Sequence, residues 1–143
     1  MKASIATALL GVAAMSSAAE GLRAVPPDQL GHYWVMTNTT LEAEVPNMGR
    51  NLDKPTCAAV TYTIGNDGRT RDIVLRKVVP AGDLGSVAVS AVANLDYAAT
   101  AANDADEPVF TYIVMPFNLP PDPAARARIT AACRLADFPK GYR

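Results

Sequence analysis

The chain has 143 residues and a formal net charge of −1, and 50% of its residues are apolar while 19% are charged. This length suits one domain, and the apolar fraction is sufficient for a packed core, which excludes an intrinsically disordered chain. Because there is no excess of basic residues to hold a phosphate backbone, we expect no nucleic-acid partner.

The N-terminal end has the pattern of a secretory signal peptide. Lys2 is followed by an uncharged run over residues 3–15, and small residues come next. We therefore predict a signal peptide over residues 1–19, cut after Ala18 or Ala19, and export to the periplasm. The alternative is an uncleaved membrane anchor, but the apolar run is short for a span and rich in weakly apolar residues.

The predicted export bears on the redox state of the two cysteines. Cys57 and Cys133 are the only pair, and an oxidising compartment allows them to form a disulfide. The alternative is two buried free thiols. A metal site is not expected, because the chain has a single histidine, His32, and no cysteines at ligand spacing.

The segment after the predicted cut, residues 20–45, is expected to be a partly extended leader. Its apolar run at residues 33–36 predicts either a short strand or a flap over the core. Residues 41–54 are rich in Pro, Gly, Asn and Asp, and predict at most one irregular helical turn.

The clearest local signal is a β-hairpin around residues 65–68, which read Gly-Asn-Asp-Gly. Val60, Tyr62 and Ile64 lie on one face of the preceding strand, and residues 73–79 form the return strand. The turn residues tolerate the positive φ angles that a tight reversal needs.

A helix is predicted over residues 84–102. Apolar residues recur at three- and four-residue steps from Leu84 to Leu95, and Ser86 is the expected N-cap. The acidic residues 103–107 that follow are interpreted as a solvated turn rather than a cation site, because nothing fixes a ligand cage.

Residues 108–119 are the most apolar segment of the exported chain and predict a long strand. Apolar side chains fall on both of its faces, and Pro116 requires an unpaired position, which indicates a sheet edge there. A short helix follows with Asp122 as N-cap, Pro123 as its first residue, and a buried stripe of Ile129, Ala132 and Cys133.

The order of these elements is hairpin, helix, long strand and terminal helix. This order predicts an α+β fold, with a small antiparallel sheet made of the hairpin and the long third strand, and helices packed on one face. Residues 46–119 would form the core domain, and residues 120–143 would form a terminal helix and tail that pack on it.

Taken together, these elements resemble the C-terminal domain of the TonB energy-transducer family. The resemblance rests on a set of short motifs in order, namely Asp67-Gly68-Arg69, Asp72-Ile73, Leu84, Ala91-Val92, Leu95, Tyr97, Pro108-Val109 and Pro116-Phe117, with Pro46 before them. It covers about residues 46–119. TolA-like domains have a similar topology and remain an alternative.

Two departures from that family bear on function. The transducers carry an uncleaved transmembrane helix that contacts a proton-driven motor, and a long spacer that crosses the periplasm. Residues 20–45 reach at most about 85–95 Å when fully extended. We therefore expect an exported, stand-alone domain of the transducer type rather than an energy transducer.

The resemblance implies binding by strand addition, in which a peptide from an outer-membrane receptor or another periplasmic protein pairs with an exposed sheet edge. Arg69, Arg71 and Tyr112 are candidates for polar contacts near such a peptide, although solvated turn positions are the preferred interpretation of the two arginines. The candidate peptide-pairing edge comprises Val109, Phe110, Thr111, Tyr112, Ile113, Val114, Met115 and Phe117. Alternatively, residues 120–143 cover that edge, and the domain is a structural or accessory module.

Catalysis is not expected. The sequence offers one histidine without a visible nucleophile, and no metalloprotease, hydrolase or phosphate-loop motif. We predict no catalytic residues, no metal and no cofactor.

Overall fold

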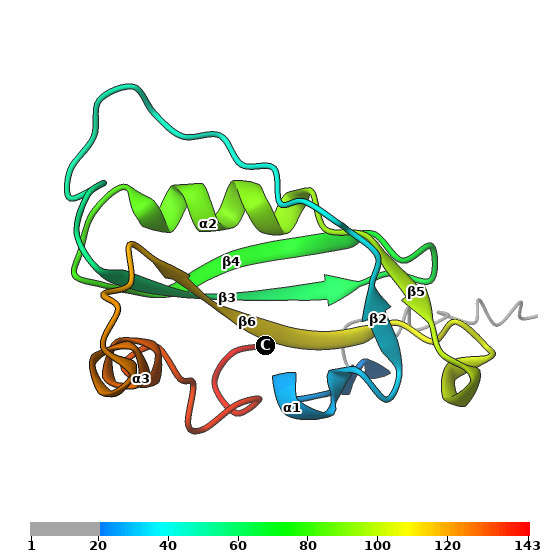
Figure 1. Cartoon of the computed structure of the whole chain (residues 1–143). Helices are drawn as coiled ribbons and strands as arrows, with labels where there is room; N and C mark the ends of the chain where they lie inside the picture. Colours follow the sequence, from blue (N-terminus) through cyan, green and yellow to red (C-terminus); the bar gives the residue numbers. More distant parts are fainter. Residues whose placement is uncertain (1–20) are drawn as a thin grey trace, which may run out of the picture.

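The computed structural model describes residues 21–143, so the predicted signal peptide and its cleavage site lie outside the described residues. The α+β class is confirmed: a four-stranded sheet of order β1-β6-β3-β4 and a two-stranded sheet of β2 and β5 are packed with helices (Figure 1). The elements are β1 (Arg23–Ala24), α1 (Pro27–Leu30), β2 (Trp34–Met36), β3 (Thr56–Ile64), β4 (Thr70–Val79), α2 (Leu84–Ala93), β5 (Tyr97–Ala99), a 3-10 helix (Ala101–Asn103), β6 (Val109–Phe117) and α3 (Pro123–Ala131).

The predicted hairpin is formed by β3 and β4, which pair antiparallel. Gly68 has φ +79°, and a Cβ there would lie 2.0 Å from the carbonyl oxygen of Tyr97, so only glycine fits this turn. The carboxylate of Asp67 accepts a hydrogen bond from the backbone N–H of Arg69, and this bond, helped by the nearby Arg71 charge, lowers the pKa of the exposed Asp67 carboxyl. The turn is thus closed by its own side chain.

The central strand β3 is buried along its whole length, and its alternate residues belong to two hydrophobic cores, one on each face of the sheet. Val60, Tyr62 and Ile64 pack against α2, while Cys57 and Ala59 pack against the C-terminal segment. Helices therefore cover both faces of the sheet, not one face as expected (Figure 1). The reason is that both faces of β3 carry small or apolar side chains, and each face needs a cover.

The sheet is mixed rather than purely antiparallel. β6 pairs antiparallel with β3 over nine positions, from Ile64↔Val109 to Thr56↔Phe117. The short strand β1 then adds to the other side of β6 in parallel. The predicted leader is thus partly built into the sheet.

Helix α2 ends at Ala93 and not at residue 102, and its N-cap is Asp83 rather than Ser86. Leu95 keeps the helical spacing and is buried, but Tyr97 belongs to β5, which pairs antiparallel with β2. Pairing with a distant strand therefore overrides the local periodicity. Residues 41–54 form bends and turns without a helix, and the chain from β2 to β3 runs alongside α2 (Figure 1).

The C-terminal segment is fixed by a covalent bond. Asp122 caps α3 through its side chain, which accepts from the backbone N–H of Ala125, and Pro123 is the first helical residue, as predicted. Cys57 and Cys133 form the predicted disulfide, with their Cα atoms 5.9 Å apart. Ile129 packs beside it, whereas Ala132 is exposed and does not belong to a buried stripe.

None of the helices within residues 21–143 has the length and apolar character that crossing a membrane requires.

Candidate functional site at the open edge of β6

The candidate peptide-pairing edge lies on the outer side of β6, away from β3. It is not free along its whole length, because β1 pairs with its first two residues, Arg23 with Val109 and Ala24 with Phe110. Val109 and Phe110 must therefore be removed from the predicted edge. From Thr111 onward, no further strand pairs with this side of β6 within residues 21–143.

The proline at position 27 explains why the pairing by β1 stops. The backbone N–H of Val25 donates to the carbonyl oxygen of Phe110 at 2.9 Å. In a parallel ladder, the next donor on this strand would be the N–H of the residue two positions on, which is Pro27. Proline has no N–H, and Pro27 instead begins α1, where a fixed φ is favourable. The edge beyond Phe110 is left without a partner strand.

The direction of the backbone groups along β6 follows from the same bond. Since the carbonyl of Phe110 points outward, the backbone groups of Tyr112, Val114 and Pro116 also point outward, because orientation alternates along a strand. The missing N–H of Pro116 therefore falls on the unpaired side, as predicted for an edge. Tyr112 and Val114 each present an N–H and a carbonyl for a further strand.

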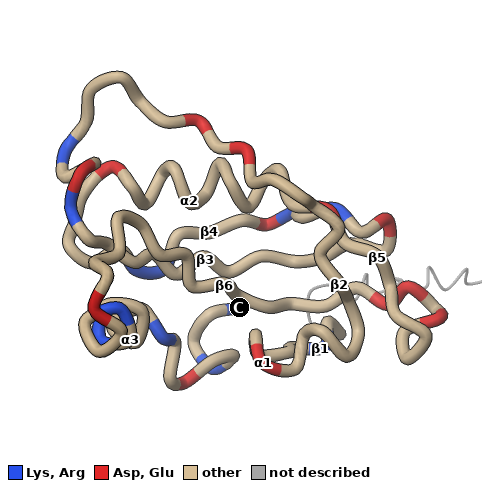
Figure 2. The backbone as a smooth tube through the Cα atoms, viewed as in Figure 1, with Lys and Arg blue, Asp and Glu red and all other residues tan. Residues whose placement is uncertain are grey.

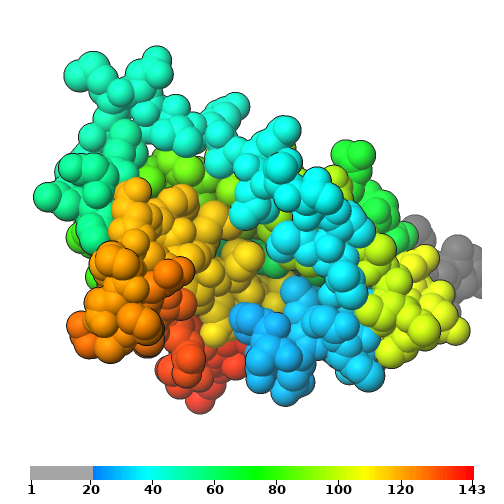
Figure 3. All heavy atoms as spheres, viewed as in Figure 1, coloured from blue at the N-terminus to red at the C-terminus, as the bar shows by residue number. Residues whose placement is uncertain are grey.

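A cleft of about 550 Å³ lies over this open stretch. Its floor is Tyr112, Ile113 and Val114, one wall comes from residues 26–28 of the α1 region, and the other from Thr130 and Arg134. In the space-filling view, atoms of β6 reach the surface between the blue α1 region and the orange and red C-terminal segment (Figure 3). An extended segment laid there would meet backbone donors and acceptors.

The C-terminal residues cover a face of the sheet rather than this edge. Phe110, Tyr112 and Val114 point toward them, and the ring of Phe138 lies 5.4 Å from that of Phe110 and 4.9 Å from that of Tyr112. The alternative that residues 120–143 cover the edge is thus met only in part, since they form one wall of the cleft.

The opposite edge of the sheet, on β4, is built against pairing. The register between β3 and β4 shifts twice, and Asp72 has φ +53°. Charged residues follow along the strand at Arg71, Asp72, Arg76 and Lys77. Bulges and charges on an edge strand prevent another strand from adding to it. By contrast, β6 has an unbroken register and carries no charged side chain.

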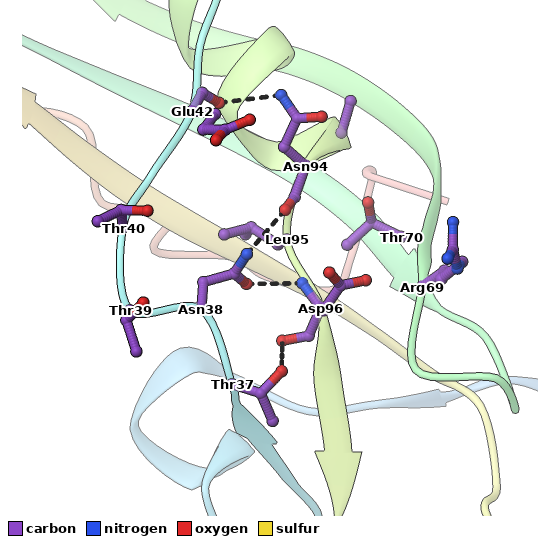
Figure 4. A pocket seen from close by; sticks show the side chains of 11 residues that line it. Thr37, Asn38, Thr39, Thr40, Glu42, Arg69, Thr70, Asn94, Leu95 and Asp96 are labelled. Atoms are coloured by element: carbon purple, nitrogen blue, oxygen red, sulfur yellow. Dashed lines mark hydrogen bonds between the residues drawn. The ribbon is translucent and has the colours of Figure 1, made fainter.

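The two arginines considered for polar contacts do not lie at the open edge. Arg71 contacts Asp67 at 3.5 Å in the hairpin turn, and both side chains are more than half exposed. Arg69 lies in a separate polar cleft of about 530 Å³ at the end of α2 (Figure 4). Of the three candidates, only Tyr112 belongs to the cleft on β6.

The polar groups of that second cleft are largely used within the chain. The side-chain amide of Asn38 pairs with the backbone as a peptide group does in a sheet. Its N–H donates to the carbonyl of Asn94 at 2.9 Å, and its oxygen accepts from the backbone N–H of Asp96 at 2.7 Å (Figure 4). Asn94 in turn donates to the carbonyl of Glu42 at 3.0 Å. The arrangement fixes the β2–β3 segment against the end of α2.

Two tyrosines with raised pKa values, Tyr62 and Tyr97, lie in the core and not in either cleft. The hydroxyls of Tyr62 and Tyr97 lie 2.6 Å apart in the core. Burial raises the pKa of Tyr62 well above its usual value, with Tyr97 adding to the shift. Burial also raises the pKa of Tyr97, against the effect of the hydrogen bond. His32 is exposed and lies edge-on to Tyr33, and within residues 21–143 no group of three metal-ligating side chains gathers.

Comparisons with family models, with curated proteins and with solved structures give no match for this chain.

Proposed function

We propose that this protein is a non-catalytic, exported binding domain that takes up an extended protein segment by strand addition to β6. The observation that carries the proposal is an apolar, regular strand edge that β1 leaves open from Tyr112 to Pro116. Main-chain hydrogen bonds would supply affinity, and the cleft walls would select side chains.

The motif resemblance to the TonB C-terminal domain supports the same mode of binding. We therefore propose a periplasmic protein as partner, in the first place the periplasmic segment of an outer-membrane receptor. Signal-peptide cleavage at residue 18 or 19 would deliver the domain to that compartment.

The second candidate is a structural or accessory domain with no peptide ligand. It is favoured by the N-terminal strand, which already occupies Val109 and Phe110. In that case, the cleft between α1 and α3 would be too narrow for a strand.

An NMR titration of the chain without residues 1–19 tests the proposal, with receptor N-terminal peptides as probes. We expect shifts and slowed hydrogen exchange at the amides of Tyr112 and Val114, and no change along β4, which serves as an internal reference. Unchanged amides at both positions would favour the accessory role.

A pair of variants makes this test sharper. Val114→Pro removes one outward N–H and leaves the pairing with β3 intact, as Pro116 does two residues on. Val114→Ala changes the side chain and keeps that N–H. Strand addition requires the proline variant to bind at least several-fold more weakly than the alanine variant.

A further inference from the structure

We propose that Asp28 and Arg134 set the direction and register of the bound segment, by pairing with one basic and one acidic residue on the same face of the added strand. The inference rests on the strand addition proposed above and specifies the chemistry of the segment.

The two charges stand on opposite walls of one cleft. Asp28 belongs to the first turn of α1, and Arg134 follows α3; both are exposed and both line the cleft over Tyr112 and Val114. Within residues 21–143, the ion pairs are Arg23–Glu107 and Arg71–Asp67, so neither Asp28 nor Arg134 forms an ion pair with another described residue. Figure 2 shows acid on α1 and mainly basic residues on α3 and beyond.

Their order along β6 follows from the backbone. Asp28 comes three residues after Val25, which bonds to Phe110. Arg134 follows Cys133, whose Cα lies 5.9 Å from that of Cys57, the residue opposite Pro116. The acidic charge therefore lies toward the start of the open edge, and the basic charge toward its end.

Backbone pairing alone does not define where a segment sits. A shift by two residues preserves every main-chain hydrogen bond and the face of each side chain. The floor of the cleft is uncharged and offers no other electrostatic signal. Charges placed at the two ends of the edge disfavour the shifted and reversed arrangements, because the ion pairs would then be lost or like charges would face each other.

The segment would thus carry two opposite charges, two or four residues apart, since such positions share one face of a strand. Its basic residue would lie by Asp28, and its acidic residue by Arg134. A segment parallel to β6 would have the basic residue first, and an antiparallel one would have the acidic residue first.

Pairs of designed peptides of one composition test this. The first pair is Ser-Val-Lys-Val-Glu-Val-Ser and Ser-Val-Glu-Val-Lys-Val-Ser, and the second separates the charges by four residues with a Thr between. For one pair at least, we expect both orders to bind about three- to tenfold more tightly than the peptide with Thr in place of both charged residues, because each order meets both charges in one of the two strand directions; this is the size typical of exposed ion pairs. The advantage should be lost in the variant Asp28→Lys, which leaves two basic charges at the cleft, and it should fade with added salt.

Asp104→Lys is the matched control, because it makes the same charge change at an exposed position outside the cleft lining. It should keep the wild-type advantage of the charged peptides. Charged peptides that bind no more tightly than their neutral counterparts, with Tyr112 and Val114 shifting on binding, would overturn the proposed charge pairing and leave strand addition standing. If a neutral Ser-Val-Thr-Val-Thr-Val-Ser peptide and all charged peptides leave these amides unmoved, both proposals are wrong.

Discussion

The backbone N–H of Val25 donates to the carbonyl of Phe110 at 2.9 Å. The next N–H of this ladder would have to come from residue 27, which is a proline and has none. One missing N–H thus divides the outer edge of β6 into a part that the chain covers itself and a part that it leaves open. Pairing by β1 and binding of a partner segment compete for the same row of backbone groups.

This competition gives a first prediction. The variant Pro26→Val/Pro27→Thr supplies the missing donor and favours extended backbone, so β1 should lengthen along β6. We expect slower hydrogen exchange at Tyr112 and Val114 and weaker peptide binding. Pro26→Val alone, which keeps Pro27, should change neither. If exchange at Tyr112 is as fast in the double variant as in the wild type, Pro27 does not limit the strand.

The disulfide gives a second prediction. Cys57 and Cys133 are 76 residues apart, and the chain-entropy model assigns roughly 4–5 kcal/mol to closing such a loop. Cys57→Ser/Cys133→Ser should therefore lower the free energy of unfolding by up to about that amount, measured in urea. Helix α3 has no buried residue, so its amides should lose protection first. A loss below about 1 kcal/mol would contradict this account.

The sequence predicted the elements whose signals are local. Alternation around residues 65–68 marked the hairpin, and β-branched and aromatic residues marked β6. The disulfide followed from having one cysteine pair in a chain that we expected to be exported. In each case the determining residues lie within one element or are the only members of their class.

The predictions that were wrong concern elements that depend on contacts between residues distant in the sequence. The residues near Tyr97 do not indicate that it pairs with β2 or that the helix ends at Ala93. The spacing of apolar residues up to Tyr97 fits a longer helix as well as a strand. Strand β1 has only two residues, too few for a periodic signal. Pro26 and Pro27 are visible in the sequence, but their effect on the candidate site appears only once β1 lies against Phe110.

A third prediction concerns the polar link at the end of α2. Asn38→Asp would replace the N–H that donates to the carbonyl of Asn94 with an oxygen, so two acceptors would face each other. We expect a loss of about 1–3 kcal/mol in urea unfolding. The same change at Asn66, which is exposed at the hairpin turn, is the control and should cost much less. Equal losses at the two positions would contradict a specific role for Asn38.

The paired tyrosines predict a dependence on alkaline pH. The folded pKa values of Tyr62 and Tyr97 lie above the unfolded value of 10.0, so folding favours the neutral phenols. Their contribution is fully present below about pH 10, and it is lost as the pH rises through the raised folded values. Stability measured in urea should fall steeply above pH 10. Tyr62→Phe/Tyr97→Phe should flatten that fall, and an unchanged slope would exclude these groups as its cause.

The hydroxyl of Thr111 gives the last prediction. It is buried on the α2 side of β6, and its oxygen has no hydrogen-bond partner within residues 21–143. A buried hydroxyl without a partner costs about 1–3 kcal/mol, and valine has nearly the same shape. Thr111→Val should therefore raise the urea midpoint with the m-value unchanged, whereas Thr111→Ser keeps the hydroxyl, loses a methyl group and should lower it. The side chain of Thr111 points to the α2 face of the sheet and does not line the cleft, so the valine variant should also bind peptide as the wild type does. A lower midpoint for the valine variant would mean that the hydroxyl is satisfied in solution, for instance by a buried water.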